Sequence, residues 1–123
     1  MSDLRERILG ADDLGSELVE VPEWGVSVDV WGLTGLQRAK LLTNAMKTNG
    51  TMDFTKAYPM LVVMSSHYPP GDEKAGQLLF EDADSDTLAS KSGTAIERLA
   101  TAALTVSGLS EEAQKKSKSL DKG

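Results

Sequence analysis

The acidic run at residues 81–86 (EDADSD) is the densest group of metal-ligating side chains in the sequence. Side-chain oxygens at alternate positions are typical of the start of a calcium-binding loop. Counted from Asp82, however, the sixth position is Thr87 where a glycine is needed, and the twelfth is Gly93 where a bidentate glutamate is needed. We therefore predict that the run begins a helix, whose dipole favours carboxylates there, and that it binds no calcium.

Two other features have the outline of a functional site but lack the groups that chemistry requires. Residues 71–78 carry glycines five apart, as in a phosphate-binding loop, but Gln77 and Leu78 stand where lysine and a hydroxyl residue are needed. His67 is the single histidine and could serve as a general base. Its place at a predicted helix end favours a structural use, as a cation near the helix C-terminus. The sequence thus predicts a protein that is not an enzyme, with no catalytic, metal-binding or cofactor-binding residues.

The overall composition argues against nucleic acid and membranes as partners. The chain has 123 residues, a net charge of −6 and no cysteine, and its pI is about 4.7. Negative charge disfavours binding to nucleic acid and to anionic membranes. The absence of cysteine excludes disulfides and thiolate chemistry. The longest apolar cluster, residues 60–64, is too short to span a membrane, so we expect protein partners.

The elements that would position any site begin with a β-hairpin at about residues 17–31. Val26, Val28 and Val30 alternate strictly with polar or aromatic residues after a glycine-containing turn. The three valines are expected to face the core and Asp29 the solvent.

Four helices are then predicted, each marked by capping residues or by 3.6-residue spacing of apolar side chains. Thr34 with Gln37 forms a capping-box pattern, and Asp53 and Ser92 are further N-cap candidates. A Schellman ending is expected at Gly108. The helices are expected at about residues 35–47, 54–67, 82–90 and 93–107, and a short one at 3–9.

These elements define the predicted fold class as α+β, an N-terminal hairpin followed by a mainly α-helical domain. Residues 1–114 are predicted to form one domain, with a last short helix starting at residue 110, and residues 115–123 a flexible tail. In the helix at 35–47, the buried face is assigned to Ala39, Leu42, Ala45 and Met46. Pro59 implies either a helix start near Tyr58 or a kink.

Exposed aromatic, sulfur-containing or basic residues are the candidates for partner contact. Trp24 and Trp31 could anchor a protein partner, although closing the hairpin is the more frequent use of such residues. Trp31 is out of phase with the valines, which predicts a place on the outer face of the sheet. Met46, Met60 and Met64 would supply adaptable contact surface wherever they are exposed. The basic run at residues 115–118 (KKSK) could contact an acidic partner, although a solvated tail is favoured.

Several segments resemble the tail assembly chaperones of long-tailed phages. These segments include residues 19–25 (VEVPEWG), 33–38 (LTGLQR), 96–99 (IERL) and 108–112 (GLSEE). The most specific piece is residues 21–25 (VPEWG). The resemblance spans most of the chain and implies a non-enzymatic role in virion assembly. Such proteins bind the tape measure protein and keep it soluble while tail tube subunits polymerise around it.

The resemblance further implies a protein of the host cytoplasm that is absent from the mature virion. Its implied partners are the tape measure protein, with the tail tube protein and further copies of this chain as other candidates. The chain would correspond to the short, non-frameshifted product of the family. The family has no compact binding motif, so no partner-binding residues are assigned. The alternative is a structural tail or head–tail protein that forms homo-oligomers and stays in the virion.

Overall fold

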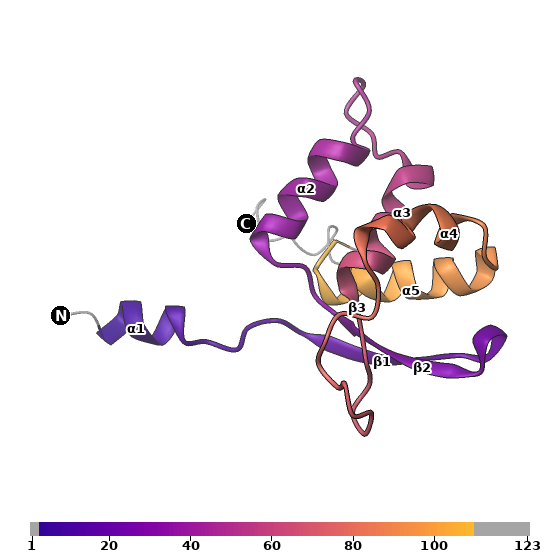
Figure 1. Ribbon diagram of the computed structural model, residues 1–123. Helices are drawn as coiled ribbons and strands as arrows, with labels where there is room; N and C mark the ends of the chain where they lie inside the picture. Colours follow the sequence, from indigo (N-terminus) through magenta and orange to yellow (C-terminus); the bar gives the residue numbers. More distant parts are fainter. Residues whose placement is uncertain (1–2, 110–123) are drawn as a thin grey trace.

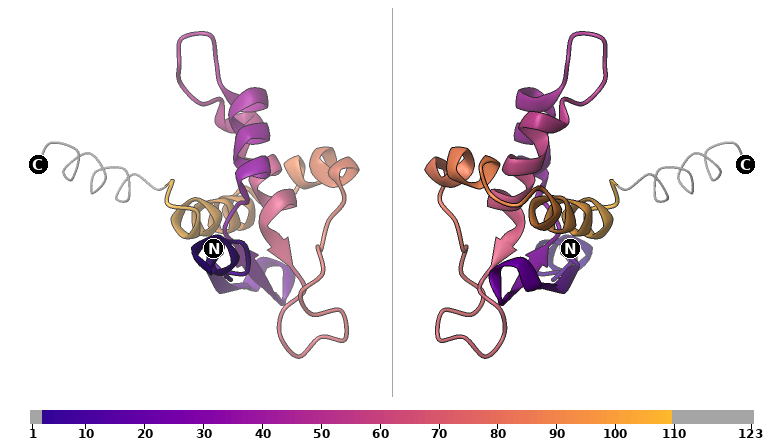
Figure 2. Two further views of the ribbon diagram at one scale, coloured as in Figure 1. Left: turned by 90° about the vertical axis from the view of Figure 1, so that its left-hand side faces the viewer. Right: turned by 90° about the vertical axis from the view of Figure 1, so that its right-hand side faces the viewer.

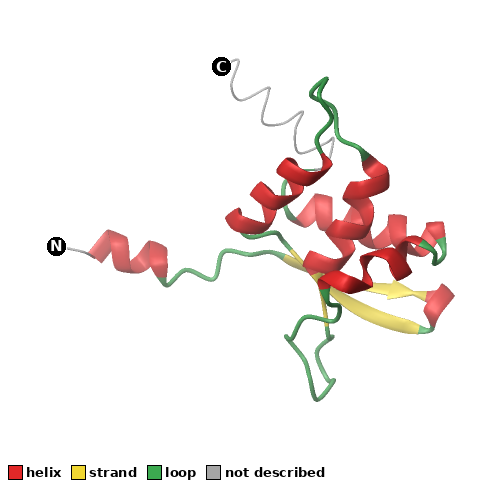
Figure 3. Cartoon of the chain, turned by 45° about the horizontal axis from the view of Figure 1, so that its top comes forward, coloured by secondary structure: helices red, strands yellow, loops and turns green. Residues whose placement is uncertain are grey.

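A three-stranded antiparallel sheet with helices packed on one of its faces forms the body of the protein (Figure 1). The computed structural model describes residues 3–109. The strands are β1 (Ser16–Val21), β2 (Val26–Trp31) and β3 (Ser66–His67), in the order β1-β2-β3. Figure 3 shows the helices gathered above the strands. The α+β class predicted from the sequence is confirmed.

The hairpin of β1 and β2 buries one face through alternating side chains. The 3-10 turn η1 (Pro22–Trp24) joins the strands, and Gly25 adopts the left-handed conformation, φ 66°, that ends it. Val28 and Val30 are buried as predicted, together with two valines of β1. Val26 is 50% exposed, against the prediction, although its cross-strand partner Val21 is fully buried.

β3 was not predicted from the sequence. The helix expected to reach residue 67 ends at Ser65, and Ser66 and His67 pair with Val30 and Asp29 of β2. The prediction of His67 as a cation at a helix C-terminus is therefore wrong in its position. Two strand residues are too few to display an alternating pattern, so nothing in the sequence separated them from the helix.

The helices α2 (Gly35–Ala45) and α3 (Phe54–Ser65) begin at the predicted caps. Thr34 and Gln37 form a reciprocal capping box, and the Asp53 side chain accepts from the Thr55 amide. α3 runs through Pro59 from a start at Phe54, so the alternative start near Tyr58 is wrong. α2 ends at Ala45, two residues before the predicted end.

The acidic run at residues 81–86 lies at a helix start, as predicted. It forms the 3-10 turn η2 (Asp82–Asp84) and the beginning of α4 (Ser85–Ala89). α5 (Gly93–Val106) begins at the Ser92 cap and crosses both long strands. Its C-terminus has the predicted Schellman pattern, because the Leu109 and Gly108 amides donate to Leu104 and Thr105.

The buried face of α2 differs from the prediction. Leu41 and Ala45 are fully covered, whereas Leu42 and Met46 are 38% and 41% exposed and Ala39 also lies on the surface. The apolar residues of this helix occupy more than one side, so their spacing does not identify the side that packs on α3.

α1 (Asp3–Leu9) projects from the body on a linker and has no buried residue (Figures 1 and 3). Figure 2 shows two loops projecting at opposite ends, at residues 46–53 and 68–77. The predicted helix from residue 110 and the tail at 115–123 lie outside the described residues, and the single domain over 1–114 stays a prediction.

Candidate functional site

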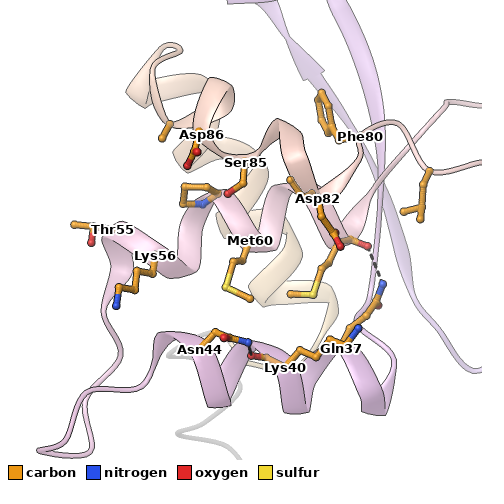
Figure 4. A pocket seen from close by; sticks show the side chains of 15 residues that line it. Gln37, Lys40, Asn44, Thr55, Lys56, Met60, Phe80, Asp82, Ser85 and Asp86 are labelled. Carbon is orange, nitrogen blue, oxygen red and sulfur yellow. Dashed lines mark hydrogen bonds between the residues drawn. The ribbon is translucent and has the colours of Figure 1, made fainter.

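A groove lies between α2, α3 and the η2–α4 segment (Figure 4). Its volume is about 710 Å³. Three stretches far apart in the sequence contribute to it, around residues 37–44, 55–64 and 78–89. It is open on one side, which suits a segment of another chain better than an enclosed small molecule.

The floor of the groove is apolar and belongs to α3. Pro59 and Val63 are buried, and Met60 and Met64 are half-buried and line the groove. Figure 4 shows the Met60 thioether in the space between α3 and α2. Flexible, polarisable methionine side chains adapt to partners of differing shape. The sequence had identified Met60 and Met64 as potential contact surface, and the structure places both in the groove.

Gln37 fixes the position of α2 beside this floor. Its backbone amide is bound by the Thr34 hydroxyl at 3.2 Å, and its side-chain Oε1 accepts from the Thr34 amide at 3.0 Å. The same side chain donates from Nε2 to the Met64 carbonyl at 3.1 Å. One residue therefore caps α2 and ties its first turn to the end of α3.

The rim of the groove carries charge of both signs. Lys40 and Lys56 extend from α2 and α3, and Asp82 and Asp86 from the η2–α4 segment. All four residues are exposed. Just outside the rim, the hydrogen bond from the Thr55 hydroxyl lowers the pKa of the Asp53 carboxyl and keeps this helix cap charged.

A second cluster lies on the sheet face opposite the helices. The ring of Trp31 stacks on His67 with centroids 3.8 Å apart, and its Nε1 donates to Asp29 at 2.8 Å. His67 Nδ1 lies 2.9 Å from the Ser65 carbonyl, so Nδ1 carries the donated proton. Trp31 thus lies on the outer face as predicted, while Trp24 packs half-buried at the edge of the core.

The remaining candidates from the sequence are the loop at residues 71–78, a metal site and the basic run at residues 115–118. Residues 71–78 form a loop in which Lys74 lies over the Tyr68 ring. No set of three acidic or histidine side chains suited to a metal comes together among residues 3–109. No helix in that range is long and apolar enough to cross a bilayer. The basic run at 115–118 lies outside the described residues.

The fold is that of a small α+β protein in which a helical layer covers one face of a three-stranded sheet. Comparison with protein families and with curated proteins finds no significant match. Among solved structures, the chain is similar to one described as the bacteriophage HK97 tail assembly chaperone, with a TM-score of 0.59 and 21% identity. The match covers 86% of this chain and 95% of that one. The predicted resemblance to tail assembly chaperones is thereby confirmed at the level of the fold.

Proposed function

We propose that this protein is a phage tail assembly chaperone that binds the tape measure protein and keeps it soluble while the tail tube forms. The observation that carries the proposal is the likeness of fold to the HK97 tail assembly chaperone over nearly the full length of both chains. The segments that resemble the family in sequence, above all residues 21–25, support the same function. The role is non-enzymatic and takes place in the host cytoplasm.

The groove on α3 is the surface best suited to a client. Tape measure proteins are long and rich in helix, and an amphipathic helix buries its apolar face in a groove of this kind. The floor formed by Met60 and Met64 offers adaptable apolar contact. The tail tube protein and further copies of this chain are candidate partners for the other exposed surfaces.

Co-expression with the tape measure protein of the same phage tests the function. We expect the client to be insoluble alone, and soluble and co-purified with this protein when both are made together. A client that stays insoluble, while this protein forms rings or tubes by itself, would favour the structural tail or head–tail protein.

The composition of purified virions provides an independent test. A chaperone acts during assembly, so quantitative mass spectrometry of tailed particles is expected to find this chain far below the stoichiometry of the tube subunits. A fixed stoichiometric presence in the particle would contradict the proposed role.

A further inference from the structure

The two sides of the groove carry opposite charges. Lys40 and Lys56 line the side formed by α2 and the first turns of α3, and Asp82 and Asp86 line the side formed by η2 and α4 (Figure 4). Within residues 3–109, none of these four side chains forms an ion pair or a side-chain hydrogen bond with another residue. The charge of Lys56 contributes to the lowered pKa of Asp53, but Lys56 forms no ion pair with it, so all four charges can still contact a bound segment.

The space above the apolar floor is comparable in volume with one face of a short helix. A helix about 10 Å in diameter occupies on the order of 850 Å³ over two turns. The groove volume of about 710 Å³ is therefore similar to half the volume of about three turns. Three turns bring three or four apolar side chains, spaced i, i+3/i+4 and i+7, onto Met60, Val63 and Met64.

We propose that the groove binds an amphipathic client helix whose two flanks carry opposite charges. Its acidic flank would face Lys40 and Lys56, its basic flank Asp82 and Asp86, and its apolar ridge the methionine floor. The inference rests on the proposed function, since it describes the segment of the client that the chaperone recognises.

This arrangement selects the direction of the bound helix as well as its composition. Reversing the helix in the groove exchanges its left and right flanks and places like charges together. Like charges across an interface suppress the wrong arrangement, so charge here sets specificity more than affinity.

The first experiment uses three designed helical probe peptides that share one apolar ridge. The first has one acidic and one basic flank, the second has two acidic flanks and the third two basic flanks. We expect the mixed peptide to bind the full chain about tenfold more tightly than either of the others, by fluorescence anisotropy in low salt. The advantage is expected to fall as ionic strength rises. Equal binding of the three peptides would overturn the proposal.

A charge-reversed variant of the groove is expected to bind a different peptide more tightly. A misfolded variant would not gain such binding. Lys40→Glu with Lys56→Glu makes both sides acidic, so the peptide with two basic flanks is expected to become the tightest ligand. Arg38→Glu with Lys74→Glu is the matched control, because it changes the net charge equally at exposed residues that do not line the groove. The control is expected to keep the wild-type order, and a control that changes the order as well would refute a role for the groove.

Co-purification with the client separates failure of this inference from failure of the proposed function. If the charge-reversed variant keeps the tape measure protein soluble as well as the wild type, the groove is not the recognition site, although the function stands. If the wild type itself captures no client, the proposed function fails. Loss of self-association in the variant, without any peptide binding by the wild type, would assign the groove to a second copy of this chain and overturn the proposal.

Discussion

Ser65 and Ser66 are adjacent and fully buried, yet their hydroxyls have different surroundings. Ser65 Oγ donates to the Leu61 carbonyl at 2.6 Å, whereas Ser66 Oγ has no partner among the described residues. Ser65→Ala is expected to lower the free energy of unfolding by about 0.5–1.5 kcal/mol, because a hydrogen bond is lost. Ser66→Ala is expected to leave it unchanged or raise it, because a buried unsatisfied group is removed. Urea denaturation of both variants measures the difference, and a larger loss for Ser66→Ala would contradict it.

Leu41 and Leu42 provide a second matched pair, on α2. Leu41 is fully buried against the core and Leu42 is 38% exposed. Leu41→Ala is expected to lower the free energy of unfolding by about 2–5 kcal/mol through lost burial and a cavity. Leu42→Ala is expected to cost less than about 1 kcal/mol, as exposed substitutions usually do. Similar losses from the two variants would mean that α2 packs through the face the sequence suggested.

The cluster of Trp31 and His67 shows what residue patterns can and cannot predict. The alternation of β2 placed Trp31 on the outer face of the sheet, and this was correct because a strand has a strict period of two. The stacking on His67 was not predictable. It depends on the two-residue strand β3, which brings residue 67 diagonally across from residue 31.

At the scale of elements, a single side-chain contact ties the turn of the hairpin to α5. The Arg98 guanidinium donates a hydrogen bond to the Glu23 carboxylate. This hydrogen bond is the main reason that the pKa of Glu23 is lowered from its ordinary value of 4.5. The positive charge of Arg98 lowers the pKa further. The two residues are 75 positions apart in the chain, so the contact joins the first half of the fold to the second.

The lowered pKa of Glu23 predicts a dependence of stability on pH. A carboxyl group with a depressed pKa in the folded state stabilises the protein above its unfolded pKa, and this contribution is lost as pH falls through the folded pKa. Glu23→Gln is therefore expected to be less stable than the wild type at pH 7, with the difference shrinking below pH 4.5. Urea denaturation at pH 7 and about pH 3 measures both differences. The control is Glu97→Gln at an exposed neighbour of Arg98, and a difference for Glu23→Gln that does not change with pH would contradict the role of this contact.

Most helix starts were predictable from the sequence, because capping is a local interaction. Thr34, Asp53 and Ser92 each accept a hydrogen bond from an amide two or three residues later, which depends on residue type and spacing alone. The side of α2 that is buried depends instead on where α3 lies, and this packing is not encoded within α2. The end of α3 was missed because β3 competes for Ser66 and His67.

At the scale of the whole molecule, the groove could not be predicted from the sequence. Its three contributing stretches are brought together only by the packing of α2 and α4 on α3. Some of the residue types that line it were predicted from the sequence. Met60 and Met64 had been identified as adaptable contacts, and residues 81–86 as an acidic helix start. The separation of lysines and aspartates onto opposite sides appears only when the fold is assembled.

Removal of α1 tests whether the body is stable without the projecting segment. α1 has seven residues and none is buried, although Leu4, Ile8 and Leu9 are large and apolar. A helix this short has little stability of its own in water. Deletion of residues 1–13 is expected to change the free energy of unfolding by less than about 0.5 kcal/mol, by urea denaturation at low protein concentration. A loss well above this would show that α1 packs on the body or on another copy.

Among residues 3–109, the order of the strands leaves β1 at one edge of the sheet, where it pairs with β2 alone. An open edge can pair with extended segments of other chains and so begin aggregation. β1 limits this hazard because it has only six residues and carries the exposed charges of Glu17 and Glu20. Two copies meeting edge to edge along β1 would bring these four carboxylates together. The negative charge of the hairpin thus protects the protein from the uncontrolled β-pairing that its own fold would otherwise invite.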